Sequence, residues 1–107
     1  MTDQQLGQIL QALRRELSRI LGDRLEAVYL FGSRARGEAR SDSDIDVLVV
    51  LRGDFDYADL IRRTSFIVSE LSLQHDVVIS RAFASKEQFA REQSPFLLSV
   101  RREGVKV

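Results

Sequence analysis

The chain has 107 residues, of which 44% are hydrophobic and 30% are charged, a composition typical of a folded globular domain. Its 16 basic and 16 acidic residues balance, so net charge gives no long-range attraction to nucleic acid, and the lack of cysteine excludes disulfides and cysteine-ligated zinc. No apolar run approaches the roughly 20 residues that span a bilayer, and the polar N-terminus predicts no signal peptide. We expect a single domain over residues 1–107, located in the cytoplasm, that binds neither a membrane nor nucleic acid directly.

The first predicted element is an amphipathic helix over residues 3–21, where apolar side chains recur at helical spacing and form one stripe. Thr2 and Gln5 have the spacing of a capping box, and Gly22 is a suitable stop. The short apolar run of residues 27–31 then predicts a buried strand.

Two more strands and a helix are predicted in the middle of the chain. Residues 45–51 are apolar and rich in β-branched side chains, which favours a second buried strand. Residues 57–71 return to helical spacing, with Asp56 as a candidate N-cap. Residues 76–79, an aspartate followed by three β-branched apolar residues, are interpreted as a third short strand.

Two helices are predicted to complete the chain. Ser85 is a candidate cap for a short helix that reaches about residue 91, and Ser94 with Pro95 begins a last helix that ends before Gly104. A short helix is also expected after the first strand. The predicted fold class is therefore α/β (α+β), with a small β-sheet flanked by helices.

The turn formed by Gly32 and Ser33 is the first candidate for chemistry, because it lies where a buried strand ends and a helix is expected to begin. Glycine allows backbone N–H groups to approach a phosphate, a helix N-terminus adds partial positive charge, and the serine adds a hydroxyl. A Gly-Ser pair after a strand more often forms an ordinary turn, so this turn alone is weak evidence for phosphate binding.

Asp44 and Asp46 are the second candidate. Side chains at positions i and i+2 of a strand share a face, so the two carboxylates stand side by side at the mouth of a buried strand. Unpaired, they would repel each other and lose solvation, and Mg²⁺ relieves both penalties. We interpret Asp42 as a loop or capping residue, whereas Asp46 lies within the apolar run.

Asp76 is a third candidate, because it opens the third predicted strand. A third carboxylate would complete a site for two cations. A strand-edge aspartate that faces water is an equally suitable interpretation, and His75 beside it is interpreted as structural or exposed. Convergence with Gly32 requires the first strand to run opposite to the other two, so the sheet should be mixed.

The combination of Gly-Ser-Arg-Ala-Arg-Gly at residues 32–37, Ser-Asp-Ser-Asp-Ile-Asp at residues 41–46 and the later Asp76 resembles the nucleotidyltransferase superfamily that includes DNA polymerase beta. It looks most like the minimal nucleotidyltransferases (MNT proteins), short prokaryotic proteins often encoded beside a HEPN-domain partner as antitoxins. The resemblance covers nearly the whole chain, including its ending from Pro95 to Val105. It implies a polymerase-beta-like nucleotidyltransferase fold.

The resemblance also implies metal-binding and catalytic roles. By position, Asp44 and Asp46 would bind two Mg²⁺ ions, and Asp76 would bind the ion at the acceptor and help to deprotonate its hydroxyl.

For the nucleotide, the resemblance implies that Gly32 and Ser33 hold the triphosphate of ATP, and that Arg34 and Arg36 neutralise phosphate charge. For the arginines, solvated side chains on a short helix are an equally suitable interpretation.

The implied reaction is transfer of AMP from ATP to an acceptor hydroxyl, with a tyrosine of a HEPN-domain toxin as the expected acceptor. Larger relatives hold the acceptor on a second domain, so here the acceptor site is expected to be shared with a partner or with a second copy in a homo-oligomer. Two alternatives stay open: a non-catalytic antitoxin that neutralises its partner by binding, and a nucleotidyltransferase that acts on RNA ends or a small molecule.

Overall fold

The structure is a computed structural model that describes residues 1–40 and 42–107. Its elements are α1 (Asp3–Leu21), a 3-10 turn η1 (Gly22–Arg24), β1 (Leu25–Phe31), α2 (Ser33–Arg36), β2 (Ile45–Leu51), α3 (Tyr57–His75), β3 (Ile79–Ser85), α4 (Lys86–Arg91), α5 (Pro95–Glu103) and β4 (Val105–Lys106). In the described part of the chain, no helix is long and apolar enough to cross a membrane.

The helices begin and end where local side chains satisfy their free backbone groups. Thr2 and Gln5 form the predicted capping box of α1, with bonds of 3.1 and 2.8 Å, and Gly22 ends that helix with a positive φ of 57°. Asp56 accepts two backbone N–H groups at the start of α3, and Ser94 caps α5 before its proline. These predicted boundaries are confirmed.

The four strands form one mixed sheet in the order β3-β2-β1-β4. β1 pairs antiparallel with β2 and with β4, whereas β2 and β3 are parallel, as the predicted convergence of the site requires. The prediction of a mixed α/β sheet is therefore confirmed. The short edge strand β4 was not predicted, because two exposed residues carry no periodic signal.

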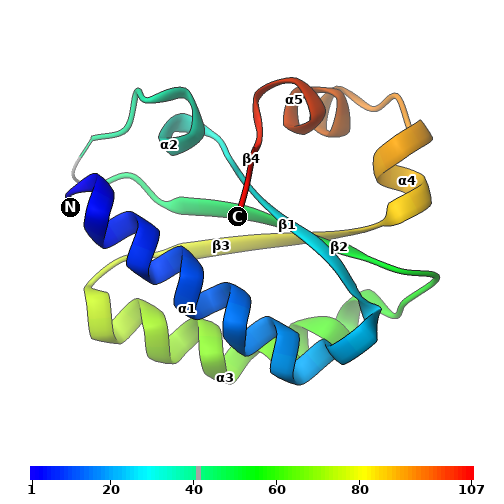
Figure 1. Cartoon of the computed structure of the whole chain (residues 1–107), viewed down its shortest axis with the longest axis horizontal. Coiled ribbons are helices and arrows are strands. Elements are labelled where there is room, and N and C mark those ends of the chain that lie inside the picture. The colour runs from blue at the N-terminus through cyan, green and yellow to red at the C-terminus, as the bar shows by residue number, and fades with distance from the viewer. Residues whose placement is uncertain (41) are drawn as a thin grey trace.

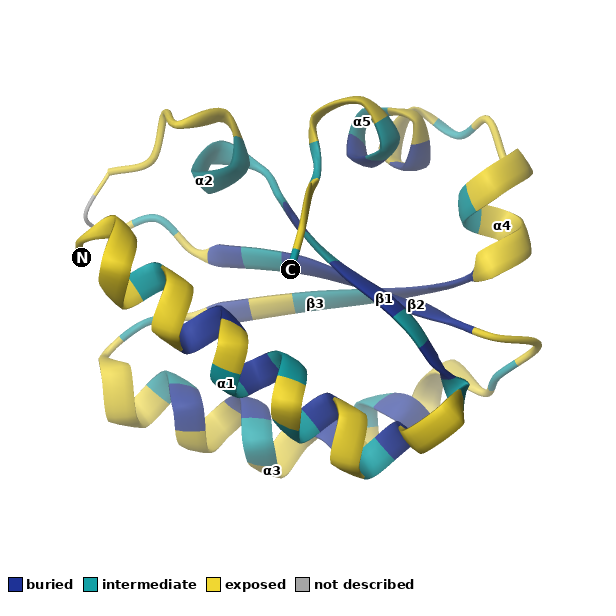
Figure 2. Cartoon of the chain, in the orientation of Figure 1, coloured by how far each residue is buried: buried dark blue, intermediate teal, exposed yellow. Residues whose placement is uncertain are grey.

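Helices cover both faces of the sheet (Figure 1). α1 and α3 lie on one side and α2, α4 and α5 on the other, and the buried residues line the strands and the inner faces of the helices (Figure 2). The larger core cluster joins α1 and α3 to alternate residues of the strands, including Leu17, Val49 and Leu60. The smaller cluster lies beneath α5 and includes Leu48 and Leu97. Each central strand is therefore buried on both sides.

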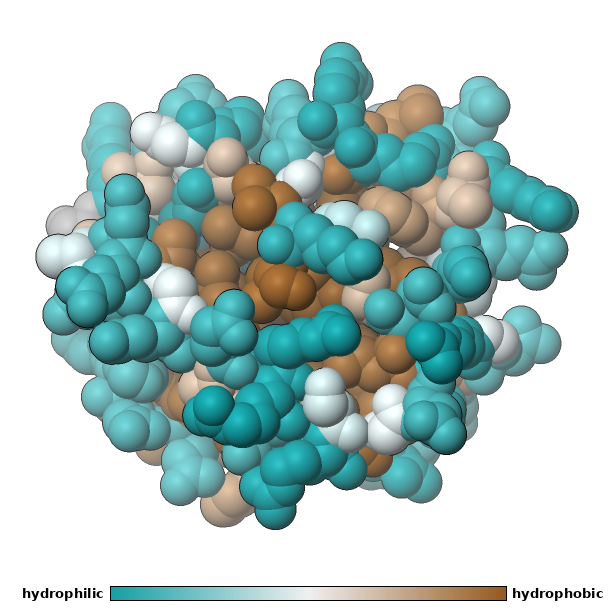
Figure 3. Space-filling view, viewed as in Figure 1, coloured by the Kyte–Doolittle hydropathy of each residue, from teal (hydrophilic) through white to brown (hydrophobic). Residues whose placement is uncertain are grey.

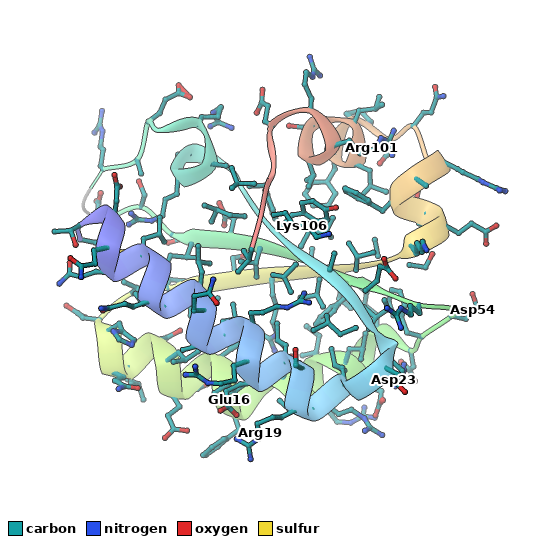
Figure 4. The ribbon with its side chains drawn as sticks, in the orientation of Figure 1. Glu16, Arg19, Asp23, Asp54, Arg101 and Lys106 are labelled. Atoms are coloured by element: carbon teal, nitrogen blue, oxygen red, sulfur yellow. The ribbon has the colours of Figure 1, made fainter. Side chains whose placement is uncertain are left out.

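The outer surface of α1 is polar, as an amphipathic helix requires, whereas α3 also exposes Phe66 and Leu73. Hydrophilic side chains cover much of the face seen in Figure 3, with hydrophobic ones between them near its middle. Figure 4 labels Glu16 and Arg19 on the outer surface of α1, where they form an ion pair of 2.8 Å. It also labels Arg101 on α5, which donates a hydrogen bond to the backbone carbonyl of Phe89 and so ties α5 to α4.

The third strand differs from the prediction for residues 76–79. α3 continues to His75, Asp76 is its C-cap with a left-handed φ of 52°, and β3 begins at Ile79. The apolar run ended at Ile79 because Ser80 and Arg81 follow it, yet both belong to the strand. Arg81 is accommodated there because its guanidinium reaches polar groups of α3.

Candidate active site

The candidate site lies at one end of the central strand pair. β1 ends at Phe31, which is in register with Asp46 near the beginning of the antiparallel β2. The turn at Gly32 and Ser33 therefore lies beside the first residues of β2. Figure 1 shows the short helix α2 above this end of the sheet. The topology thus joins the glycine–serine turn to Asp44 and Asp46, as predicted.

Gly32 is required here by space and by backbone conformation. Its φ of 77° and ψ of −158° lie in a region that is essentially restricted to glycine. A Cβ atom added at this position would lie 2.5 Å from Oδ2 of Asp46. Sequence reasoning connected this glycine with phosphate binding, whereas the structure shows that it also leaves room for a carboxylate.

Asp46 is partly buried, and its electrostatic environment disfavours the ionised form. Burial raises the pKa of the Asp46 carboxyl above its usual value, the negative charge of Asp44 raises it further, and the positive charge of Arg34 opposes the shift. Asp44 is exposed and lies immediately before β2, two residues from Asp46, rather than within the strand as expected. Two adjacent carboxylates of this kind suit a Mg²⁺ ion, which proteins commonly hold through one or two carboxylates together with phosphate oxygens.

Arg34 fixes the loop that leads into β2. Its Nε and Nη2 atoms donate to the backbone carbonyl of Ser43 over 3.1 and 2.6 Å. This fork holds the residue immediately before Asp44 against α2, and the same charge acts on Asp46. Sequence reasoning missed this positioning role, because a bond to a backbone carbonyl leaves no pattern in the side chains.

Arg36 forms ion pairs with two glutamates and not with Asp44 or Asp46. Its Nε atom lies 2.6 Å from Glu38, and its Nη1 atom lies 3.5 Å from Glu103 on α5. The structure therefore uses this arginine to join α2 to α5. Ser33 is the first residue of α2, and its carbonyl accepts the backbone N–H of Glu38.

Asp76 does not open the third strand, so that part of the prediction is wrong. It is an exposed helix cap beside a cavity of about 410 Å³ that also contacts Gln5 and Ile9 of α1 and the exposed His75. Within residues 1–40 and 42–107, no three acidic, histidine or cysteine side chains are grouped so that they could hold a metal ion. The metal ligands that the structure brings together are thus the two carboxylates of Asp44 and Asp46.

Known proteins are similar to this chain in sequence and in fold. A family model described as a nucleotidyltransferase domain matches residues 10–102. A protein of Methanocaldococcus jannaschii that carries the provisional name protein adenylyltransferase is 32% identical over 100 residues, which is 94% of this chain and 96% of the relative. The protein adenylyltransferase MntA of Thermococcus cleftensis is 32% identical over 85 residues, which is 79% of this chain and 84% of that protein.

Solved structures show the same fold at lower identity. A protein of Sulfolobus solfataricus that carries the provisional name nucleotidyltransferase matches with a TM-score of 0.59 and 21% identity, over 99% of this chain and 87% of that chain. A toxin–antitoxin structure with AMP-PNP matches with a TM-score of 0.58 and 23% identity, over 88% of this chain and 68% of that chain. The family match over residues 10–102 and the relative that is 32% identical over 94% of the chain show that this chain belongs to the nucleotidyltransferase domain family.

Proposed function

We propose that this chain is a Mg²⁺-dependent protein adenylyltransferase that transfers AMP from ATP to a tyrosine hydroxyl of a HEPN-domain toxin, and so acts as its antitoxin. The observation that carries the proposal is the pair of carboxylates beside the turn at Gly32, with Asp46 in β2 and Asp44 as the residue immediately before it. Relatives named protein adenylyltransferase, 32% identical over most of the chain, support the choice of a protein acceptor. A structural neighbour at 24% identity and TM-score 0.57 is a MntA–HpeT toxin–antitoxin mutant, which supports the choice of partner.

The chain's own residues bind and orient the nucleotide in this proposal. The backbone of Gly32 and Ser33 and the serine hydroxyl contact the triphosphate, while Asp44 and Asp46 hold Mg²⁺. When bound, Mg²⁺ neutralises charge on the phosphates and polarises the phosphorus centre. Arg34 keeps the loop before Asp44 in place through its bond to the Ser43 carbonyl.

The transfer step forms one bond and breaks one. The acceptor oxygen attacks the α-phosphorus, the bond between that phosphorus and the α,β-bridging oxygen breaks, and pyrophosphate leaves with the electron pair. The hydroxyl proton passes to a base at the acceptor, a role for which Asp76 stays a prediction. Such catalysis consists mainly of positioning and charge neutralisation. Loss of either carboxylate of the pair is therefore expected to lower the rate by about two to three orders of magnitude.

The test is label transfer from ATP labelled at the α-phosphate. The chain is incubated with Mg²⁺ and a purified HEPN-domain protein of the same organism, and that protein is then analysed by gel and by mass spectrometry. We expect the partner to gain label and the mass of AMP with the wild type, and to gain neither with the Asp44→Asn, Asp46→Asn double variant. Asp42→Asn, an exposed loop acid close to the pair, is the matched control and should transfer label normally.

Other outcomes would change the assignment. If the double variant neutralises the toxin as well as the wild type does, the chain acts by binding alone and the catalytic proposal is wrong. If label instead appears in RNA or in a small molecule from a host lysate, the acceptor class is wrong. If neither the partner nor any component of the lysate gains label with any of the four nucleotides, the chain has no transferase activity.

A further inference from the structure

The residue beside Asp46 on the neighbouring strand is Ser80. In the parallel pair of β2 and β3, Asp46 is in register with Ser80, while on β1 it is in register with Phe31. Residues in register on adjacent strands present their side chains to the same face of the sheet. Ser80 therefore stands next to the Asp46 carboxylate, on the face covered by α2 and α5.

The packing of the neighbouring rows supports this orientation. Leu48 and its register partner Ala82 both belong to the smaller core cluster under α5. Arg81, which lies between Ser80 and Ala82, points to the opposite face, where its Nε atom donates to Thr64 of α3 over 2.7 Å. Because side chains alternate along a strand, the exposed Ser80 is on the side of the candidate site.

Ser80 is the residue of β3 in register with Asp46, and it carries a neutral hydroxyl where a carboxylate would lie beside the pair. Across the three neighbouring strands β1, β2 and β3, the residues in register at this level are Phe31, Asp46 and Ser80. Asp76 lies three residues before β3 begins, as a helix cap with a left-handed backbone, so it has no place in that row. Within the described ranges, no third acidic side chain is grouped with Asp44 and Asp46.

We infer that this chain holds one divalent cation through Asp44 and Asp46, rather than two, because the neutral Ser80 beside Asp46 supplies no charged ligand for a second cation. Two-metal sites place their ions roughly 3.5–4 Å apart, and ligands that the ions do not share offset their mutual repulsion. Here the protein offers one pair of carboxylates, and the neutral Ser80 hydroxyl adds no charge. The inference rests on the proposed function for the identity of the site, but it concerns the number of cations and not the transfer.

The test counts Mn²⁺ ions by electron paramagnetic resonance. The chain alone should bind one Mn²⁺, and Asp46→Asn should bind none. With α,β-methylene-ATP present, the wild type should show only uncoupled Mn²⁺. Ser80→Asp should bind a second ion and show a spin-coupled pair, whereas Ser80→Asn, which is similar in size but neutral, should behave as the wild type does.

Several results would overturn the inference. It would be contradicted if the wild type bound two Mn²⁺ ions, showed a spin-coupled pair, or bound no Mn²⁺. If the wild type bound two ions and Asp76→Asn lost one of them, Asp76 would be the ligand of the second ion. A Ser80→Asp variant that keeps its fold by circular dichroism but shows no coupled pair would contradict the role of Ser80. A chain that binds one Mn²⁺ yet labels no acceptor would reject the proposed function alone, and a labelling chain with a coupled pair would reject this inference alone.

Discussion

Gly32→Ala is expected to damage the site through a single methyl group. The new Cβ would lie 2.5 Å from Oδ2 of Asp46, so the carboxylate must move by about 1 Å to reach ordinary van der Waals contact. Alanine is also strained at the φ of 77° and ψ of −158° of this position, by about 1–3 kcal/mol. For a domain of this size, that strain corresponds to a fall in melting temperature of roughly 5–20 °C.

The catalytic loss should exceed what reduced stability explains. A misplacement of about 1 Å at a reacting group lowers rates by roughly 10²-fold. Label transfer should therefore fall by that order at a temperature at which the variant is still folded. Circular dichroism during heating gives the melting temperature of the same sample.

Gly53→Ala is the matched control. Gly53 has a φ of 80°, and its added Cβ would meet no atom of the described residues within 4 Å. It lies in the turn at the far end of β2, where Figure 4 labels the neighbouring Asp54. The control should lose stability but keep its transfer rate. If Gly32→Ala transfers label as fast as Gly53→Ala does, the argument that Gly32 makes room for the Asp46 carboxylate is refuted.

Three further predictions concern stability. The folded state raises the pKa of the Asp46 carboxyl, so its ionisation opposes folding. The stabilisation that is present below the unfolded pKa is therefore lost as the pH rises through the folded pKa. Without metal at pH 7, Asp46→Asn should melt at a higher temperature than the wild type, and the difference should shrink as the pH is lowered. Arg34→Ala should destabilise the chain by about 1 kcal/mol and increase hydrogen exchange in the following loop, whereas Arg36→Ala, which breaks surface ion pairs, should change stability by less than about 1 kcal/mol. Thr64→Val should cost about 1–3 kcal/mol in urea unfolding, because the fully buried Thr64 hydroxyl accepts from Arg81; a neutral result would contradict that role.

The parts of the fold that follow from local patterns were predictable from the sequence. The strand over residues 45–51 has the predicted bounds, because its apolar run is buried on both faces and is interrupted only by Asp46. The caps at Thr2, Asp56 and Ser94 were predictable as well, because each bonds to backbone within three residues. The direction of the first strand followed from the requirement that Gly32 meet the carboxylates.

The parts that depend on distant contacts were not predictable. Arg81 looked like the end of a strand because its charge is offset by groups 16 to 20 residues away on α3. Asp76 looked like the start of a strand because a left-handed backbone at an aspartate has no reliable sequence signal. The register that sets Ser80 beside Asp46 became visible only with the pairing of β2 and β3.

The antiparallel connection between β1 and β2 also has a consequence for how the molecule folds. The glycine turn and both carboxylates lie within residues 32–46, and they meet through pairing of strands that are neighbours in the chain. The pairing of β2 with β3 instead requires the whole of α3 as a crossover. Local contacts form faster than distant ones. The part of the candidate site that contains Gly32, Asp44 and Asp46 can therefore assemble early, and Ser80 joins it only after the long crossover has closed.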